Sequence, residues 1–144
     1  MSKVAVIYWS GTGNTEEMAN AIADRLKEKE IDIDIYQASG FDASKLADYD
    51  GFAFGCPAMG DESLEDGEFE PMFESVESKL DSKPVVIFGS YEWNDGQWML
   101  NWQERCKNSN INLASDGLAV YSSPEDDDIE SCQDLADDLS LIHI

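Results

Sequence analysis

A short apolar run near the N-terminus, followed at once by a glycine-rich turn, constrains the fold of this chain more than any other feature. Residues 3–9 read KVAVIYW, a run too short for a helix and rich in branched and aromatic side chains. Such a run predicts a strand buried on both faces, as in a parallel sheet. The turn, residues 10–15, reads SGTGNT, and beyond it apolar residues recur at helical spacing at Met18, Ala19, Ile22, Ala23 and Leu26. The chain therefore opens with a strand, a tight turn and an amphipathic helix.

The turn offers hydrogen-bond donors that suit an anion. It joins the carboxyl end of a strand to the first turn of a helix, where backbone N–H groups lack partners. The turn contains no Lys or Arg, so neutral donors alone would hold one phosphate of a larger cofactor. The candidate ligands are Ser10, Gly11, Thr12, Gly13, Asn14 and Thr15.

The turn matches neither of two familiar phosphate-binding loops. A Walker loop is excluded because no Lys follows Gly13, and the dinucleotide fingerprint is excluded because Glu16 replaces its third glycine. A simple helix cap remains open, with Asn14 or Thr15 as the capping residue. We expect phosphate binding in preference to capping.

The charge of the chain restricts its partners. Its 144 residues have the size of a single domain, and 31 acidic against 9 basic residues give a formal net charge of −22. Such a surface repels nucleic acid and anionic membranes. A protein partner with a basic docking face fits it, and a solvated surface tuned for solubility or high salt is the alternative.

The cysteines and the apolar segments indicate a cytoplasmic protein. Cys56, Cys106 and Cys132 are odd in number and form no CxxC pair, which fits reduced thiols better than disulfides. No apolar run is long enough to span a bilayer, and the N-terminus shows no signal peptide. We therefore expect a cytoplasmic location.

Strand and helix patterns alternate along the chain, which predicts a doubly wound parallel sheet. The later strands are expected at 31–36, 51–56, 83–89 and 117–121. The later helices are expected at 69–80, 98–106 and 126–139, with a short one near 44–46. Ligands bind such sheets beyond the carboxyl ends of the strands, so loops 10–15, 56–62 and 90–96 should meet there.

These loops together offer a slot for a flat heteroaromatic ring. The second loop contains Met59 and Gly60 beside two carboxylates, and the third contains Tyr91 and Trp93. A thioether and an indole are polarisable and uncharged, and can hold a ring between them. Each alone could equally be a core or surface side chain. Their convergence with the phosphate-binding turn favours a cofactor site.

Four motifs in order resemble the short-chain flavodoxins of clostridia and related anaerobes. They read YWSGTGNTE at 8–16, GCPAMGDE at 55–62, EFEP at 68–71 and FGSY at 88–91. The match runs from Val4 to about Ala136 without an insertion. The resemblance implies one α/β domain over residues 1–144. Its flavodoxin-like fold would be a doubly wound five-stranded parallel sheet in the order 2-1-3-4-5, with helices on both faces.

The resemblance also implies FMN bound without a covalent link. The 10–15 turn would hold its phosphate, and Met59 and Trp93 would face the two sides of the isoalloxazine. Glu62 would accept a hydrogen bond from the ring N3–H. The carbonyl of Gly60 would turn toward N5 on reduction, which glycine permits at low cost. The further cofactor-binding residues implied are Pro57, Ala58, Asp61, Ser90, Tyr91, Glu92 and Gln97.

The function implied by the resemblance is a low-potential one-electron carrier, not an enzyme, with no catalytic residue and no metal. The carrier would cycle mainly between a neutral semiquinone and an anionic hydroquinone, whose formation nearby carboxylates disfavour. Its partners would be ferredoxin- or flavodoxin-dependent reductases and oxidoreductases with basic docking faces. The chain itself would act as a monomer.

Two alternative functions use a similar topology. An FMN-dependent NAD(P)H quinone or nitro reductase usually carries longer inserted loops, which this chain lacks. A signalling receiver domain needs an aspartate after the third strand and a lysine after the fourth, where Cys56 and Ser90 stand. We rank the carrier first, the reductase second and the receiver last.

Some residues depart from the family pattern. Glu92 and Asn94 stand in the third loop where close relatives have glycine, which alters the loop beside the pyrimidine end of the ring. Pro57 stands where some relatives have a phosphate-binding serine. Residues 139–144 fit no family pattern and are either a frayed helix end or a non-native tail, and His143 has no expected role.

Overall fold

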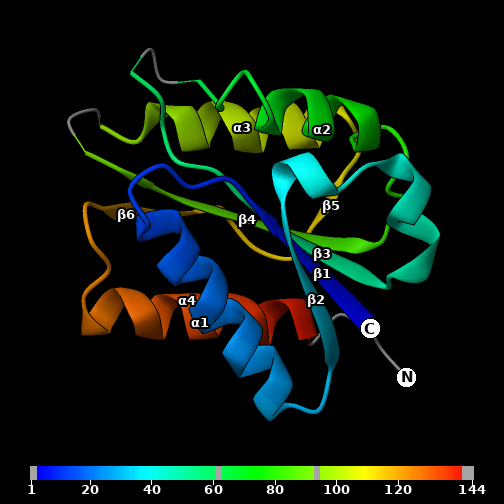
Figure 1. The fold of residues 1–144 in the computed structure, drawn as a ribbon, viewed down its shortest axis with the longest axis horizontal. Coiled ribbons are helices and arrows are strands. Elements are labelled where there is room, and N and C mark those ends of the chain that lie inside the picture. The colour runs from blue at the N-terminus through cyan, green and yellow to red at the C-terminus, as the bar shows by residue number, and fades with distance from the viewer. Residues whose placement is uncertain (1–2, 61–62, 93–94, 141–144) are drawn as a thin grey trace.

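A parallel sheet lies between two layers of helices in the computed structural model, which describes residues 3–60, 63–92 and 95–140 (Figure 1). The strands are β1 (Lys3–Tyr8), β2 (Asp32–Gln37), β3 (Gly51–Gly55), β4 (Pro84–Tyr91), β5 (Asn112–Leu113) and β6 (Leu118–Tyr121). They lie in the order β2-β1-β3-β4, with β5 and β6 beyond β4, and all pairs are parallel. The predicted α/β fold and strand order 2-1-3-4-5 are confirmed.

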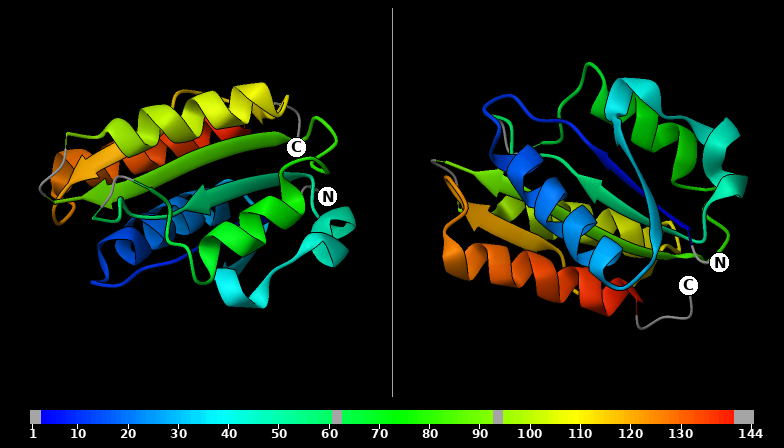
Figure 2. Two further views of the ribbon diagram at one scale, coloured as in Figure 1. Left: turned by 90° about the horizontal axis from the view of Figure 1, so that it is seen from above. Right: turned by 60° about the horizontal axis from the view of Figure 1, so that its bottom comes forward.

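Helices cover both faces of the sheet, as predicted (Figure 2). The helices are α1 (Asn14–Glu28), α2 (Phe69–Val76), α3 (Gln97–Asn108) and α4 (Asp126–Ser140), and the 3-10 segments are η1 (Ala38–Gly40) and η2 (Ala43–Asp48). One core layer lies between the sheet and α1 with α4. The other lies between the sheet and α2, α3 and the 3-10 segments.

The central strands are buried because they carry apolar side chains on both faces. In β1, Ala5 and Ile7 pack in the α2–α3 layer. Val4 and Val6 pack in the α1–α4 layer, and all four side chains are fully buried. Each fully buried large aliphatic side chain stabilises the fold by about 1.5–3 kcal/mol, so these strands anchor the edge that carries the loops.

The fifth strand position is divided between two short strands, which gives the described part of the chain a sheet of six strands. β5 pairs with Pro84 and Val85 at the start of β4, and β6 pairs with residues 88–91 at its end. The prediction of one strand at 117–121 found only β6. The two residues of β5 are too few to show an alternating pattern.

The ends of β4 and α2 are among the element boundaries that differ from the prediction. β4 continues to Tyr91, so Ser90 and Tyr91 end a strand instead of beginning a loop. The helix predicted at 69–80 already ends at Val76, although Leu80 is buried in the turn that follows.

β2 is the edge strand next to β1. Its alternating polar and apolar residues do not divide it into a solvent-exposed face and a buried face. Ile35 is 40% exposed. The half-buried Asp34 accepts a hydrogen bond from the Tyr49 hydroxyl at 2.7 Å and pairs with Lys3 Nζ at 3.2 Å. Tyr49 therefore covers the side of the strand that carries Asp34.

Both ends of the described chain lie at the edge of the sheet opposite the carboxyl ends of the strands (Figure 1). Lys3 begins β1 there, and Ser140 ends α4 there. Leu139, which the family pattern left in doubt, is fully buried in the α1–α4 layer and belongs to the fold. Residues 141–144 lie outside the described residues.

Candidate functional site

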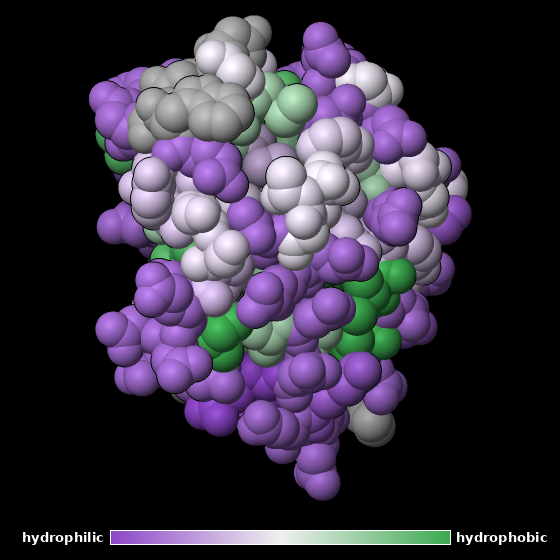
Figure 3. Space-filling view, turned by 60° about the vertical axis from the view of Figure 1, so that its left-hand side comes forward, coloured by the Kyte–Doolittle hydropathy of each residue, from purple (hydrophilic) through white to green (hydrophobic). Residues whose placement is uncertain are grey.

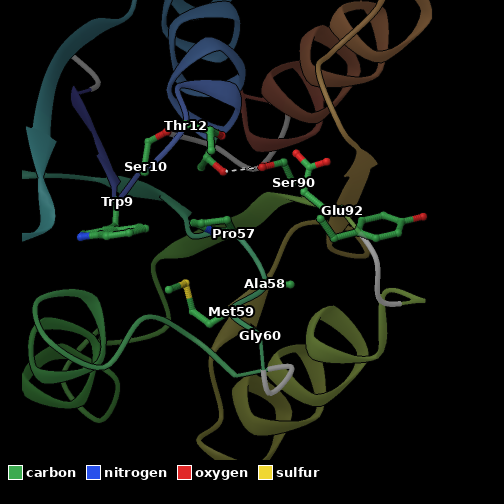
Figure 4. A pocket seen from close by; sticks show the side chains of 12 residues that line it. Trp9, Ser10, Thr12, Pro57, Ala58, Met59, Gly60, Ser90 and Glu92 are labelled. Atoms are coloured by element: carbon green, nitrogen blue, oxygen red, sulfur yellow. Dashed lines mark hydrogen bonds between the residues drawn. The ribbon is translucent and has the colours of Figure 1, made fainter.

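A cavity of about 230 Å³ opens at the carboxyl ends of β1, β3 and β4. Ser10 and Thr12 lie on one side of it, and Met59 and Gly60 lie on the other (Figure 4). The structure therefore brings the loops after these strands together, as predicted. The lining residues are Trp9, Ser10, Gly11, Thr12, Thr15, Pro57, Ala58, Met59, Gly60, Ser90, Tyr91 and Glu92.

The first loop is ordered by its own hydrogen bonds. The Oγ of Ser10 accepts from the backbone N–H of Gly13 at 3.1 Å and from that of Glu16 at 3.3 Å. Gly13 is the N-cap of α1 and has a φ of 98°, a left-handed conformation that favours glycine. The N-cap is therefore neither Asn14 nor Thr15, the two residues that the capping interpretation named.

Two side-chain contacts join the first loop to the end of β4. The hydroxyl oxygens of Thr15 and Ser90 lie 3.0 Å apart, and both residues are buried. The amide of Asn14 donates to Oε1 of Glu92 at 3.4 Å. These contacts fix the first and third loops relative to each other.

Backbone hydrogen bonds hold the start of the second loop against β4. The N–H of Cys56 donates to the carbonyl of Phe88, and the N–H of Ala58 donates to the carbonyl of Ser90, both at 3.0 Å. Gly89 lies so close that a Cβ on it would overlap the carbonyl oxygen of Cys56. The wall of the cavity is therefore packed backbone against backbone.

Among the described residues, Gly60, unlike Gly89, has free space around its Cα. Its φ is not positive, and a Cβ on it would meet no described atom within 4 Å. Alanine would fit at this position in the described conformation, in contrast to Gly89.

Glu65 orders the far end of the second loop. Its carboxylate is buried and accepts from the backbone N–H groups of Gly67, Glu68 and Phe69 at 2.8, 2.7 and 2.8 Å. These groups lie at the start of α2, where N–H groups have no partner within the helix. Burial alone would raise the pKa of Glu65, but these hydrogen bonds stabilise its charged form, so the pKa lies below the ordinary value.

The cysteines are core side chains. Cys56, Cys106 and Cys132 are free and buried, and burial raises the pKa of each thiol. A neutral thiol is a poor nucleophile. Within the described residues, no cluster of His, Cys, Asp and Glu is placed to hold a metal, and no helix has the length and apolarity needed to cross a membrane.

Trp9 lines the cavity but was not predicted to do so. It was assigned to the first strand, whereas β1 ends one residue earlier at Tyr8. Its ring faces the cavity, and its Nε1 donates to the carboxylate of Glu68 at 3.0 Å. Its place directly before the turn was the available signal, because residues just beyond a parallel strand lie at the ligand-binding edge.

Most of the predicted site residues line the cavity. Those that do are Ser10, Gly11, Thr12, Thr15, Pro57, Ala58, Met59, Gly60, Ser90, Tyr91 and Glu92. Gly13 and Asn14 belong to the first loop without lining the cavity. Gln97 lies in the first turn of α3, where its amide donates to Asn101 at 3.0 Å. The predicted residues that lie outside the described part of the chain are Asp61, Glu62 and Trp93, together with the neighbouring Asn94.

The edge around the cavity is acidic. Glu92 lines the cavity, and Glu68 contacts Trp9 at its side. Hydrophilic side chains surround a paler central area on this side of the molecule (Figure 3). The ion pairs of the described residues involve none of the lining residues; they join Lys3 to Asp34, Arg25 to Glu28 and Asp137, Lys29 to Asp137, and Arg105 to Glu70 and Glu77.

The donors and walls of the cavity fit FMN. The hydroxyls of Ser10 and Thr12 and the N-terminus of α1 suit a phosphate. The opposite walls suit a planar ring, since they are apolar or polarisable. These wall residues are Trp9, Pro57, Met59 and Tyr91.

Comparison with known proteins agrees with this site. The family model described as Flavodoxin matches residues 6–134. A flavodoxin of Clostridium beijerinckii is 40% identical over 121 residues, which cover 84% of this chain and 88% of the relative. A flavodoxin of Megasphaera elsdenii is 38% identical over 134 residues, covering 93% and 96%. The solution structure of two-electron reduced Megasphaera elsdenii flavodoxin has a TM-score of 0.85 at 37% identity, covering 96% of this chain and 98% of that one.

These similarities extend over nearly the whole chain and give no support to an FMN-dependent reductase. They also cover the three loops that form the cavity. The chain belongs to the flavodoxin family: it binds FMN and transfers electrons, and it is not an enzyme.

Proposed function

We propose that the chain is a low-potential one-electron carrier that cycles its FMN mainly between the neutral semiquinone and the anionic hydroquinone. The observation that carries this proposal is a phosphate-type loop without cations, joined to an apolar cavity on an acidic edge. Placing further negative charge on a cofactor beside carboxylates, and shielded from water, costs free energy. The second electron is therefore added at low potential and makes the carrier a strong reductant.

The cavity residues receive separate roles in this proposal. The 10–15 loop holds the phosphate, and Met59 packs against one side of the ring. Trp93 and Glu62 lie outside the described residues; in this proposal Trp93 would pack against the other side of the ring and Glu62 would accept from the ring N3–H. The carbonyl of Gly60 would accept a hydrogen bond from N5–H of the reduced ring. The protein binds and orients the cofactor, and FMN supplies the redox chemistry.

Gly60→Ala should destabilise the semiquinone without destabilising the fold. A Cβ at this position meets no described atom, so the free energy of unfolding should change by less than about 0.5 kcal/mol. A turned peptide favours glycine by about 1 kcal/mol, so the semiquinone formation constant should fall about fivefold. An anaerobic dithionite titration of the FMN-loaded protein, followed by visible absorbance, measures this constant.

The wild-type protein provides the reference in the same titration. A blue neutral semiquinone should accumulate before the flavin bleaches. Direct bleaching without a radical would contradict the one-electron proposal. Equal shifts of both one-electron potentials in Gly60→Ala would contradict only the role given to Gly60.

Electron transfer to a basic partner should be fast and sensitive to salt, because the net charge of −22 attracts a basic docking face. The Debye length falls from about 10 Å at 0.1 M salt to about 3 Å at 1 M. The rate constant for reducing a basic haem protein such as cytochrome c should fall about tenfold over that range in stopped-flow experiments. A neutral small oxidant serves as the control. The same salt dependence for both acceptors would argue against electrostatic docking.

We include in the proposal that the carrier is a cytoplasmic monomer. The free, buried thiols suit a reducing compartment. A single copy leaves the acidic edge around the cavity open to redox enzymes with basic docking faces, such as reductases that accept electrons from ferredoxin or flavodoxin.

A further inference from the structure

Glu92 lines the cavity beside the loop to which the phosphate is assigned. Its Oε1 accepts from the amide of Asn14 at 3.4 Å, and Asn14 belongs to that loop. Figure 4 shows Glu92 on the same side of the cavity as Thr12 and Ser90. The carboxylate of Glu92 therefore lies next to the loop that is proposed to bind the phosphate.

The backbone holds Glu92 close to this loop. Ser90, two residues earlier, is buried and its hydroxyl lies 3.0 Å from that of Thr15. Tyr91, the residue directly before Glu92, pairs with Tyr121 of β6. The backbone directly before Glu92 is thus held by Thr15 on one side and by β6 on the other.

Neither of the loops beside this carboxylate carries a cation. No Lys or Arg occurs between Lys3 and Arg25, or between Lys83 and Arg105, so neither the first nor the third loop carries one. Arg25 pairs with Glu28 and Asp137, and Arg105 pairs with Glu70 and Glu77. Within the described residues no ion pair involves Glu92, so the two loops beside it supply no positive charge to offset its own.

We propose that Glu92 is a specificity-determining residue that weakens the binding of the phosphate of FMN and so narrows the preference for FMN over riboflavin. This inference rests on the proposed placement of the phosphate in the 10–15 loop. Like charges repel, and the repulsion acts on the phosphate of FMN but not on the uncharged chain end of riboflavin. The carboxylate also engages the amide of Asn14, a donor of the same loop. The chain thus binds FMN less tightly, and releases it faster, than it would without the negative charge of Glu92.

The test compares the dissociation constants of FMN and riboflavin for the wild type, Glu92→Gln and Asp95→Asn, measured on apoprotein by fluorescence quenching at low salt. Glutamine keeps the length of the side chain and an oxygen that accepts from Asn14, and it removes only the charge. Asp95 is the matched control. It lies in the same loop, its carboxylate accepts from the N–H of Gln97 at 3.3 Å, and it does not line the cavity.

Glu92→Gln should bind FMN about fivefold more tightly than the wild type, with the affinity for riboflavin unchanged. Asp95→Asn should change neither affinity by more than about twofold, because the charge of an exposed side chain that does not line the cavity is screened by salt. An unchanged ratio of the two affinities in Glu92→Gln would overturn the inference, as would an equal gain in Asp95→Asn. Failure of the wild type to bind either flavin would instead overturn the proposed function, and the inference with it.

Discussion

Gly89→Ala should lower the free energy of unfolding by about 3 kcal/mol, because the added Cβ has no room. It would overlap the carbonyl oxygen of Cys56 and lie 3.1 Å from Cζ2 of Trp98. β3 and β4 are paired neighbours, so the backbone of one strand must move. The movement would reach the cavity through the hydrogen bond between Ala58 and Ser90, so the affinity for FMN should fall as well.

Urea unfolding followed by circular dichroism measures this change, and Gly40→Ala is the matched control. Gly40 is exposed, its φ is not positive, and a Cβ on it would meet no described atom within 4 Å. Its substitution should change the free energy of unfolding by less than about 0.5 kcal/mol. Equal stability of the two variants would contradict the prediction. It would mean that the backbone around Cys56 and Gly89 shifts to accommodate the added Cβ at little cost in free energy.

Glu65→Ala should destabilise the fold by about 2–3 kcal/mol, because backbone N–H groups at the start of α2 would lose their acceptor. The loop that carries Met59 and Gly60 would then have to be ordered when the cofactor binds. The affinity for FMN should therefore fall about tenfold. Urea unfolding and flavin binding measure the two effects separately. Glu74→Ala, an exposed position on α2, removes the same charge and should leave both quantities nearly unchanged.

The stabilisation from Glu65 should also depend on pH. The pKa of Glu65 in the folded chain lies below the ordinary value of 4.5, so folding favours its charged form. The contribution is fully present above pH 4.5 and is lost as the pH falls through the folded pKa. The wild type should therefore lose stability more steeply than Glu65→Ala below pH 4.5. Parallel losses in the two proteins would contradict the link between this carboxylate and the start of α2.

The buried strands and the longer helices could be predicted from the sequence because their patterns are local. β1, β3 and β4 are apolar runs, and α1 repeats its apolar residues at helical spacing. Parallel strands then place the ends of β1, β3 and β4 at one edge, which is why Ser10, Met59 and Ser90 were predicted to lie around one site.

The remaining features depend on contacts between distant segments. Thr15 and Ser90, whose hydroxyls meet in the site, are 75 residues apart in the chain. The acceptor role of Glu65 depends on how its loop folds back onto α2, and an acidic run alone does not indicate it. The cofactor role of Gln97 rests on family resemblance alone and stays a prediction; in the structure its amide donates to Asn101. The roles of Glu62 and Trp93 stay predictions.

The position of Lys3 and Ser140, at the edge of the sheet away from the cavity, has a consequence for how such a carrier can be used (Figure 1). A second domain fused at either end would leave the cofactor edge uncovered. A flexible linker of suitable length would then turn the encounter with a redox enzyme into an intramolecular event, with an effective concentration in the millimolar range. The same fold can therefore serve as a diffusing carrier or as a tethered module without any change at its redox centre.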